Sequence, residues 1–125
     1  MQAVLIDTSV WSEHFRRPQA LLATLLSDGL AVTHEMVIQE LALSMAAQNL
    51  AILDDIIGLG LLPTVTLEEY LKFFSSNKIA GQKIGCVDTN LLASCKLAAA
   101  GLYTLDKHLS SAARACNIEV IEQSA

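Results

Sequence analysis

The stretch Ala3-Val4-Leu5-Ile6-Asp7-Thr8-Ser9 decides the fold, because four apolar residues are followed at once by three polar ones. An apolar run that is this short and does not alternate is typical of a buried parallel strand, and the helical spacing after it predicts a helix. Further strands are expected at residues 30–33, 102–105 and 118–121, an extended segment at 63–65, and helices at 10–15, 19–26, 34–48, 50–57, 67–75, 87–100 and 107–115. Strands that alternate with helices predict an α/β fold whose parallel sheet is covered on both faces.

The composition fits one intracellular domain. The chain has 125 residues, the size of a single domain spanning 1–125, and 53% of them are hydrophobic. This fraction indicates either apolar surface kept for a partner or a helical core rich in Ala and Leu. No apolar run reaches the roughly 18–20 residues of a membrane span, and no secretory signal is visible. Cys86, Cys95 and Cys116 form no Cys-x-x-Cys pair, so we expect buried thiols in the cytoplasm.

The formal charge of −5 argues against a broad basic surface for duplex DNA. It leaves a nucleic-acid substrate open, because acids gathered around a cation would leave the remaining surface closer to neutral. Local phosphate contacts could come from Arg16, Arg17, Lys72, Lys78, Lys83 and Lys107. The histidines, His14, His34 and His108, show no metal-ligand spacing, and we expect surface or capping positions for them.

Two acids follow predicted strands. Asp7 comes directly after the first strand and Asp106 directly after the strand at 102–105, so both are expected at the carboxyl edge of the sheet, where ligands bind. Each also precedes a helix, so either one could simply be an N-cap.

Two further acids lie on helices. Glu40 shares a face with Val37, Leu41 and Ser44, so its carboxylate is predicted to point inward, where it needs a cation, a hydrogen-bond network or a raised pKa. Asp88 lies near the start of its helix on the face of the apolar residues that follow, although an Asp in a first turn also favours the helix dipole.

Taken together, Asp7, Glu40, Asp88 and Asp106 predict one acidic pocket. Carboxylates brought this close repel one another, and a hard divalent cation resolves the conflict. Oxygen ligands without clustered His or Cys favour Mg²⁺ or Mn²⁺ over zinc. Such ions serve phosphoryl chemistry by activating water and neutralising phosphate charge.

The sequence resembles the PIN domains, and among them the VapC-type toxins of bacterial toxin–antitoxin pairs, across essentially its whole length. Four segments match the family motifs in order and spacing: Leu5 to Trp11 (LIDTSVW), Val37 to Ala42 (VIQELA), Val87 to Ala93 (VDTNLLA) and Tyr103 to Lys107 (YTLDK). The resemblance implies a three-layer α/β/α domain with a central parallel sheet of four to five strands. It also implies a Mg²⁺- or Mn²⁺-dependent endoribonuclease, usually a homodimer, neutralised by a small antitoxin that inserts a segment into the active-site groove.

Carried over by motif, Asp7, Glu40, Asp88 and Asp106 are the acidic residues that hold metal and catalyse, and Ser9 is a small polar residue beside the site. Many PIN domains have a further acid shortly after the fourth one, whereas Lys107 and His108 follow Asp106 here. We therefore expect one tightly held ion.

The expected mechanism is attack of a metal-oriented water on an RNA phosphodiester, with Asp7 and Asp88 as the chief metal ligands. Glu40 would be the base or an orienting group, and Asp106 would complete the charge. Two alternatives remain: a PIN-like domain that binds RNA or protein without turnover, and a receiver-type signalling domain. A receiver domain would need adjacent acids after the first strand and a Lys ending a late strand, whereas Asp7 precedes Thr8 and the late strand ends in Asp106.

Overall fold

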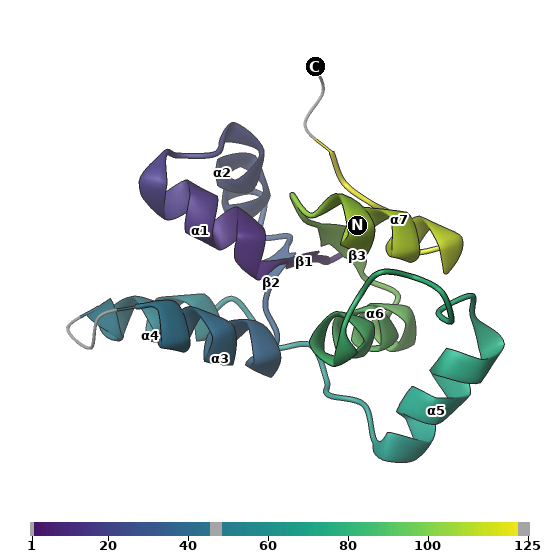
Figure 1. Ribbon diagram of the computed structural model, residues 1–125. Helices are drawn as coiled ribbons and strands as arrows, with labels where there is room; N and C mark the ends of the chain where they lie inside the picture. Colours follow the sequence, from purple (N-terminus) through teal and green to yellow (C-terminus); the bar gives the residue numbers. More distant parts are fainter. Residues whose placement is uncertain (1, 46–48, 123–125) are drawn as a thin grey trace.

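The computed structural model describes residues 2–45 and 49–122, and a parallel sheet lies at its centre (Figure 1). The described strands are β1 (Val4–Ile6), β2 (Ala31–Val32) and β3 (Gly101–Tyr103), in the order β2-β1-β3. Strand β1 is fully buried, and its Leu5 pairs with Val32 on one side and with Leu102 on the other. The first apolar run is therefore the middle of the sheet, as a run without alternation predicts.

Helices cover the sheet on both sides, and the predicted α/β fold is confirmed. They are α1 (Thr8–Arg16), α2 (Ala20–Ser27), α3 (Glu35–Ser44), α4 (Ala51–Ile57), α5 (Leu67–Ser76), α6 (Cys86–Ala98) and α7 (Lys107–Ala115). In Figure 1, α1, α2 and α7 lie above the sheet, and α3, α4, α5 and α6 lie below it. Helix α6 is the one most deeply enclosed, with Leu91 to Cys95 all buried.

The prediction of four to five strands was wrong for the described residues, which form three. The predicted strand at 118–121 forms a single parallel bridge, from Val120 to Leu102, and at the other edge the bridge to Thr33 is made by Leu61, just before the predicted extended segment at 63–65. The neighbouring strands are only two and three residues long, so they offer few backbone groups for pairing. Pro63 lacks a backbone N–H, so it cannot donate a hydrogen bond to a neighbouring strand. The two extra runs therefore extend the sheet without becoming strands.

Several helix ends differ from the sequence prediction. Helix α3 stops at Ser44, because Met45 is extended, and the predicted continuation at 46–48 lies outside the described residues. Helix α6 ends at Ala98, and the next residue, Ala99, takes the left-handed conformation (φ 53°) that a glycine commonly supplies after a helix. Gly101 instead permits a close approach, since an added Cβ would lie 3.3 Å from the Glu119 carbonyl oxygen.

Other local predictions held. The helix expected at 67–75 begins where predicted, and Thr66 caps it through a capping box with Glu69. Cys95 and Cys116 are buried, but Cys86 is exposed, which corrects the expectation for that thiol. Among the described residues, none of the helices combines the length and the apolar character that crossing a bilayer requires.

Candidate active site

The four acids predicted from the sequence come from four elements and act on one another. Asp7 follows β1, Glu40 lies in α3, Asp88 is in the first turn of α6, and Asp106 precedes α7. Burial, and then the charges of Asp7, Asp106 and Glu40, raise the pKa of Asp88 from 3.8 to about 6. The four carboxylates therefore share one electrostatic environment, which we call the acidic site.

Asp7 is the most enclosed of the four, with only 6% of its surface exposed. It occupies the N-cap position of α1, but its side chain makes no capping hydrogen bond. Its Oδ2 instead accepts hydrogen bonds from Ser9 Oγ at 2.6 Å and from Thr104 Oγ1 at 2.7 Å. The simple N-cap interpretation therefore fails for Asp7. Its Oδ1 has no hydrogen-bond partner among the described residues and is available to a ligand.

Backbone donors fix the direction of both hydroxyl groups. Ser9 Oγ accepts from the N–H of Leu105 at 3.0 Å, and Thr104 Oγ1 accepts from the N–H of Asp106 at 3.0 Å. A hydroxyl has one proton to donate, so each accepting bond leaves that proton for Asp7. Thr104 thus joins the strand ends that carry Asp7 and Asp106.

Ser9 is expected from the family motif, whereas Thr104 is not, because it lies inside the run 102–105 that predicts a strand. Strand β3 ends at Tyr103, so Thr104 already belongs to the turn at the carboxyl edge. A polar residue near the end of an otherwise apolar run, two positions before an acid, is the feature that could have identified it.

Glu40 is half-buried and also has a hydroxyl partner, because Thr8 Oγ1 donates to Glu40 Oε1 at 2.8 Å. This bond links α3 to the first residue of α1 and brings Glu40 beside Asp7. The inward orientation predicted from helical spacing is borne out by this contact. Its other oxygen, Oε2, makes no hydrogen bond to the described residues.

Asp106 has a structural role that Asp7 lacks. Its Oδ1 accepts from the N–H groups of His108 at 2.8 Å and Leu109 at 3.3 Å, so it caps α7. The capping interpretation therefore holds for this residue, which is exposed. Capping occupies one carboxylate oxygen, and Oδ2 makes no hydrogen bond to the described residues.

The donor chemistry of the acidic site fits a hard divalent cation, since only carboxylate and hydroxyl oxygens are present. Within residues 2–45 and 49–122, no three His, Cys, Asp or Glu side chains already converge on one point at ligand distance. This spacing is compatible with Mg²⁺, which usually keeps several waters and takes one or two carboxylates directly. The raised pKa of Asp88 shows that ionising this carboxylate is unfavourable here, because it is partly buried and lies near three other acids. A bound cation would offset this negative charge.

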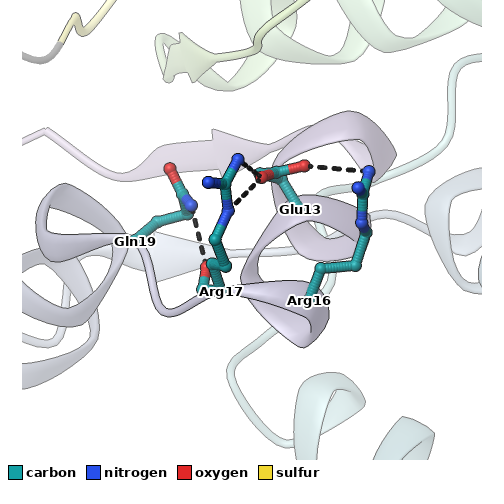
Figure 2. A network of polar contacts seen from close by, with 4 residues as sticks. All are labelled: Glu13, Arg16, Arg17 and Gln19. Carbon is teal, nitrogen blue, oxygen red and sulfur yellow. Dashed lines mark hydrogen bonds and ion pairs between the residues drawn. The ribbon is translucent and has the colours of Figure 1, made fainter.

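Basic residues lie on the exposed part of α1. Figure 2 shows Glu13 between Arg16 and Arg17, with Arg17 Nη2 at 3.0 Å and Arg16 Nη1 at 3.5 Å from its carboxylate oxygens. Gln19 donates to the Arg17 carbonyl oxygen at 2.8 Å and holds the end of the helix. Two guanidinium groups share one carboxylate, so this patch has a net positive charge.

Comparison with known proteins decides the family, although no family model matches the chain. Ribonuclease VapC32 of Mycobacterium tuberculosis, in strains CDC 1551 / Oshkosh and ATCC 25618 / H37Rv, is 40% identical to this chain over 121 residues. The match covers 96% of this chain and 98% of the relative. The chain belongs to the VapC ribonucleases. The resemblance seen in the sequence motifs is thereby confirmed over nearly the full length.

Solved structures agree with the fold of this VapC-family chain. A structure of FitAB bound to an IR36 DNA fragment has a TM-score of 0.69 at 20% identity and covers 94% of this chain and 93% of its own. FitAcB from Neisseria gonorrhoeae has a TM-score of 0.69 at 23% identity, with 95% and 96% covered. The acidic site thus lies in a VapC fold at the carboxyl edge of its sheet.

Proposed function

We propose that this VapC-family chain is the toxin of a toxin–antitoxin pair and cuts RNA as a Mg²⁺- or Mn²⁺-dependent endoribonuclease. The observation that carries the proposal is the position of Asp88, whose pKa is raised to about 6 by burial and then by the charges of Asp7, Asp106 and Glu40. A fold gains no stability from four acids in one place, so their juxtaposition indicates a ligand of opposite charge.

Two carboxylates are the chief candidates for direct contact with the cation. Asp7 offers Oδ1, because its Oδ2 is engaged by Ser9 and Thr104. Asp88 is half-buried and faces the other three charges, so it gains most from a positive neighbour. When bound, the cation lowers the pKa of a coordinated water and offsets charge on the phosphate. Since this chain lacks the further acid that many PIN domains have after the fourth one, one ion is expected.

Glu40 is placed to handle a proton or to orient a water. The hydrogen bond from Thr8 to Oε1 fixes the direction of its carboxylate and leaves Oε2 free to accept. Asp106 is tied to the start of α7 and contributes mainly negative charge and the backbone N–H that orients Thr104. Water is then the nucleophile and the 3′-oxygen is the leaving group, so the product ends are a 5′-phosphate and a 3′-hydroxyl.

The RNA backbone needs positive charge outside the acidic site. Lys107 directly follows Asp106 and is exposed, and the patch around Arg16 and Arg17 lies further along α1 from Asp7. These cations are local, so the chain contacts a short stretch of single-stranded or looped RNA rather than a long duplex face.

The antitoxin is proposed to cover an apolar groove between α1, α2 and α4. A cavity of about 370 Å³ lies here, lined by Trp11, His14, Phe15, Leu26, Ile52, Asp55, Ile56 and Leu59. The rings of Trp11 and Phe15 stack with centroids 6.1 Å apart, and Phe15 is 41% exposed. An amphipathic segment of a small partner protein fits such an aromatic-walled groove. The groove begins on α1, the helix that follows Asp7, so a chain bound here would reach the acidic site.

A second copy of the chain is proposed to pack against α5 and α6. Leu71 and Phe74 of α5 and Leu97 of α6 are exposed by 55%, 41% and 53%. Leu97 also lines a cavity of about 320 Å³ between α5 and α6, together with Phe73 and Ala93. A homodimer would remove this apolar surface from water. Sedimentation velocity of the wild type and of Leu71→Lys tests it, because the variant should sediment as a monomer.

The proposal is tested by cleavage of a mixed RNA pool in Mg²⁺ or Mn²⁺, with and without EDTA, by the wild type and by Asp7→Asn. Glu119→Gln is the matched control, because Glu119 is an exposed acid away from the carboxyl edge of the sheet. Its backbone carbonyl accepts from the N–H of Leu102 in β3. Cleavage should require the metal, fall in Asp7→Asn and persist in Glu119→Gln. RNA binding without cleavage in every metal would favour a PIN-like domain without turnover. Equal cleavage by the Asp7→Asn variant would remove Asp7 from the site.

A further inference from the structure

A buried histidine lies between the two helices that carry acids, and the proposed reaction does not use it. His34 directly follows the bridge residue Thr33 after β2 and is only 1% exposed, which corrects the expectation that it lies at the surface. Its Nδ1 accepts from the Met36 N–H at 3.0 Å, so His34 caps α3. The capping position, one of the two expected from the sequence, is therefore confirmed. The Nε2 of His34 lies 2.9 Å from Ser94 Oγ of α6.

These two contacts determine which ring nitrogen has the proton. Nδ1 accepts from a backbone N–H, so it has no proton, and the proton of the neutral ring is on Nε2. Nε2 therefore donates to Ser94 Oγ. Burial lowers the pKa of His34, with the charge of Glu35 opposing it, so the ring is neutral at pH 7. The bond from α3 to α6 has one direction and one geometry.

The two ends of this bond stand at matched distances from two acids. His34 precedes Glu40 by six residues, and Ser94 follows Asp88 by six residues. Six residues of helix correspond to about 9 Å. The bond thus joins the start of α3 to the middle of α6. About 9 Å away along each helix, the charge of Glu40 acts on Asp88.

A buried polar pair of this kind generally adds little net stability over apolar packing, which points to a geometric role. Ser94 is fully buried between the apolar residues of α6, and His34 lies against the core. A buried polar pair replaced by apolar groups of similar shape is often neutral or stabilising, whereas one partner left alone is costly. Such a pair holds a single arrangement of the elements it joins, because other arrangements leave a buried donor unsatisfied.

We propose that His34 and Ser94 are positioning residues that set the separation of Glu40 and Asp88, and with it the affinity of the acidic site for a divalent cation. This inference rests on the proposed metal-dependent function. Neither residue touches the cation or the RNA. Each acts through the helix that carries a carboxylate.

The test is calorimetric titration of Mn²⁺ into the metal-free full chain. Ser94→Ala removes the acceptor and keeps the α3 cap. His34→Asn keeps a favoured N-cap residue but is too short to reach α6, and it covers the case in which Ser94→Ala folds poorly. Thr33→Val is the control for a lost buried hydroxyl, since Thr33 Oγ1 has no partner among the described residues. Cys95→Ala is the control for lost core packing in α6 itself.

The clamp variants are Ser94→Ala and His34→Asn, which each break the bond between His34 and Ser94. Both should bind Mn²⁺ about tenfold more weakly than the wild type. This is the lower end of the affinity losses seen when a group that orients a metal ligand is removed. Their RNA cleavage should recover at saturating Mn²⁺ with an unchanged KM for RNA. Unchanged Mn²⁺ affinity in both clamp variants would overturn the inference while leaving the function intact, as would an equal loss in Cys95→Ala. Absence of Mn²⁺ binding by the wild type would overturn the inference and the proposed function together.

Discussion

Asp88 is the acid whose removal separates stability from activity most clearly. In the metal-free chain its carboxylate is half-buried and faces the charges of Asp7, Asp106 and Glu40, and its pKa rises to about 6. Asn has nearly the same shape and no charge. Asp88→Asn should therefore unfold less readily than the wild type at neutral pH while losing activity, because the acidic site loses a proposed cation ligand.

The magnitude follows from the two pKa values. A rise from 3.8 to about 6 would correspond to about 3 kcal/mol for a fully enclosed group. Solvent screens a half-buried carboxylate, so a stabilisation of about 1–2 kcal/mol is expected for Asp88→Asn at pH 7. The folded state holds a proton that the unfolded state releases between about pH 4 and pH 6. Raising the pH through this window therefore costs the wild type stability, and the cost is absent below about pH 4.

Urea unfolding in EDTA at pH 7 and at pH 4 measures this difference, with Glu119→Gln as the variant that loses an exposed acid. The Asp88→Asn chain should be more stable than the wild type at pH 7 and equal to it at pH 4. Adding Mg²⁺ at pH 7 should stabilise the wild type and leave the variant unchanged. The reasoning is refuted if Asp88→Asn is no more stable than the wild type at pH 7, or if its advantage persists at pH 4.

Three further outcomes are expected. Thr104→Val removes one of the two hydroxyl donors to Asp7 and should weaken Mn²⁺ binding about 10- to 100-fold. Calorimetry measures this affinity, and an unchanged value would show that Ser9 alone suffices to orient Asp7. Phe15→Glu should weaken binding of the antitoxin by more than about tenfold while RNA cleavage is retained. Leu43→Glu, at an exposed leucine outside the groove, should leave antitoxin binding unchanged. Pull-down with the antitoxin measures binding by both variants, and equal binding would place the antitoxin elsewhere. Sequencing of cleaved RNA should find 5′-phosphate and 3′-hydroxyl ends, and a 2′,3′-cyclic phosphate would contradict the water mechanism.

The sequence predicted the fold because its first run contains the decisive information. Residues 3–6 are apolar without alternation, which requires burial on both faces, and they form the central strand. The outer strands were overpredicted because pairing depends on a neighbour's length, which no local pattern reveals. The run at 118–121 is apolar except for Glu119, yet among the described residues it forms a single bridge, from Val120 to Leu102.

The acids were predictable from position, whereas their hydrogen-bond partners were not. Asp7 and Asp106 looked alike in the sequence, since each ends a strand and precedes a helix. The structure separates them: Asp106 caps α7, and Asp7 accepts two hydroxyl bonds instead. Thr8, Thr104 and His34 act through partners about 30 to 100 residues away in the chain, so only the folded arrangement reveals their contacts.

The claim that the acidic site is the RNA-cleaving centre is tested most directly by single-turnover cleavage of one defined RNA in Mn²⁺. Asp7→Asn is compared with Glu119→Gln at equal folded concentration. Loss of the cation site should slow the Asp7→Asn chain by at least about a thousandfold and leave Glu119→Gln at the wild-type rate. Equal rates for the two variants would contradict the account, because the cleavage would then arise outside the acidic site.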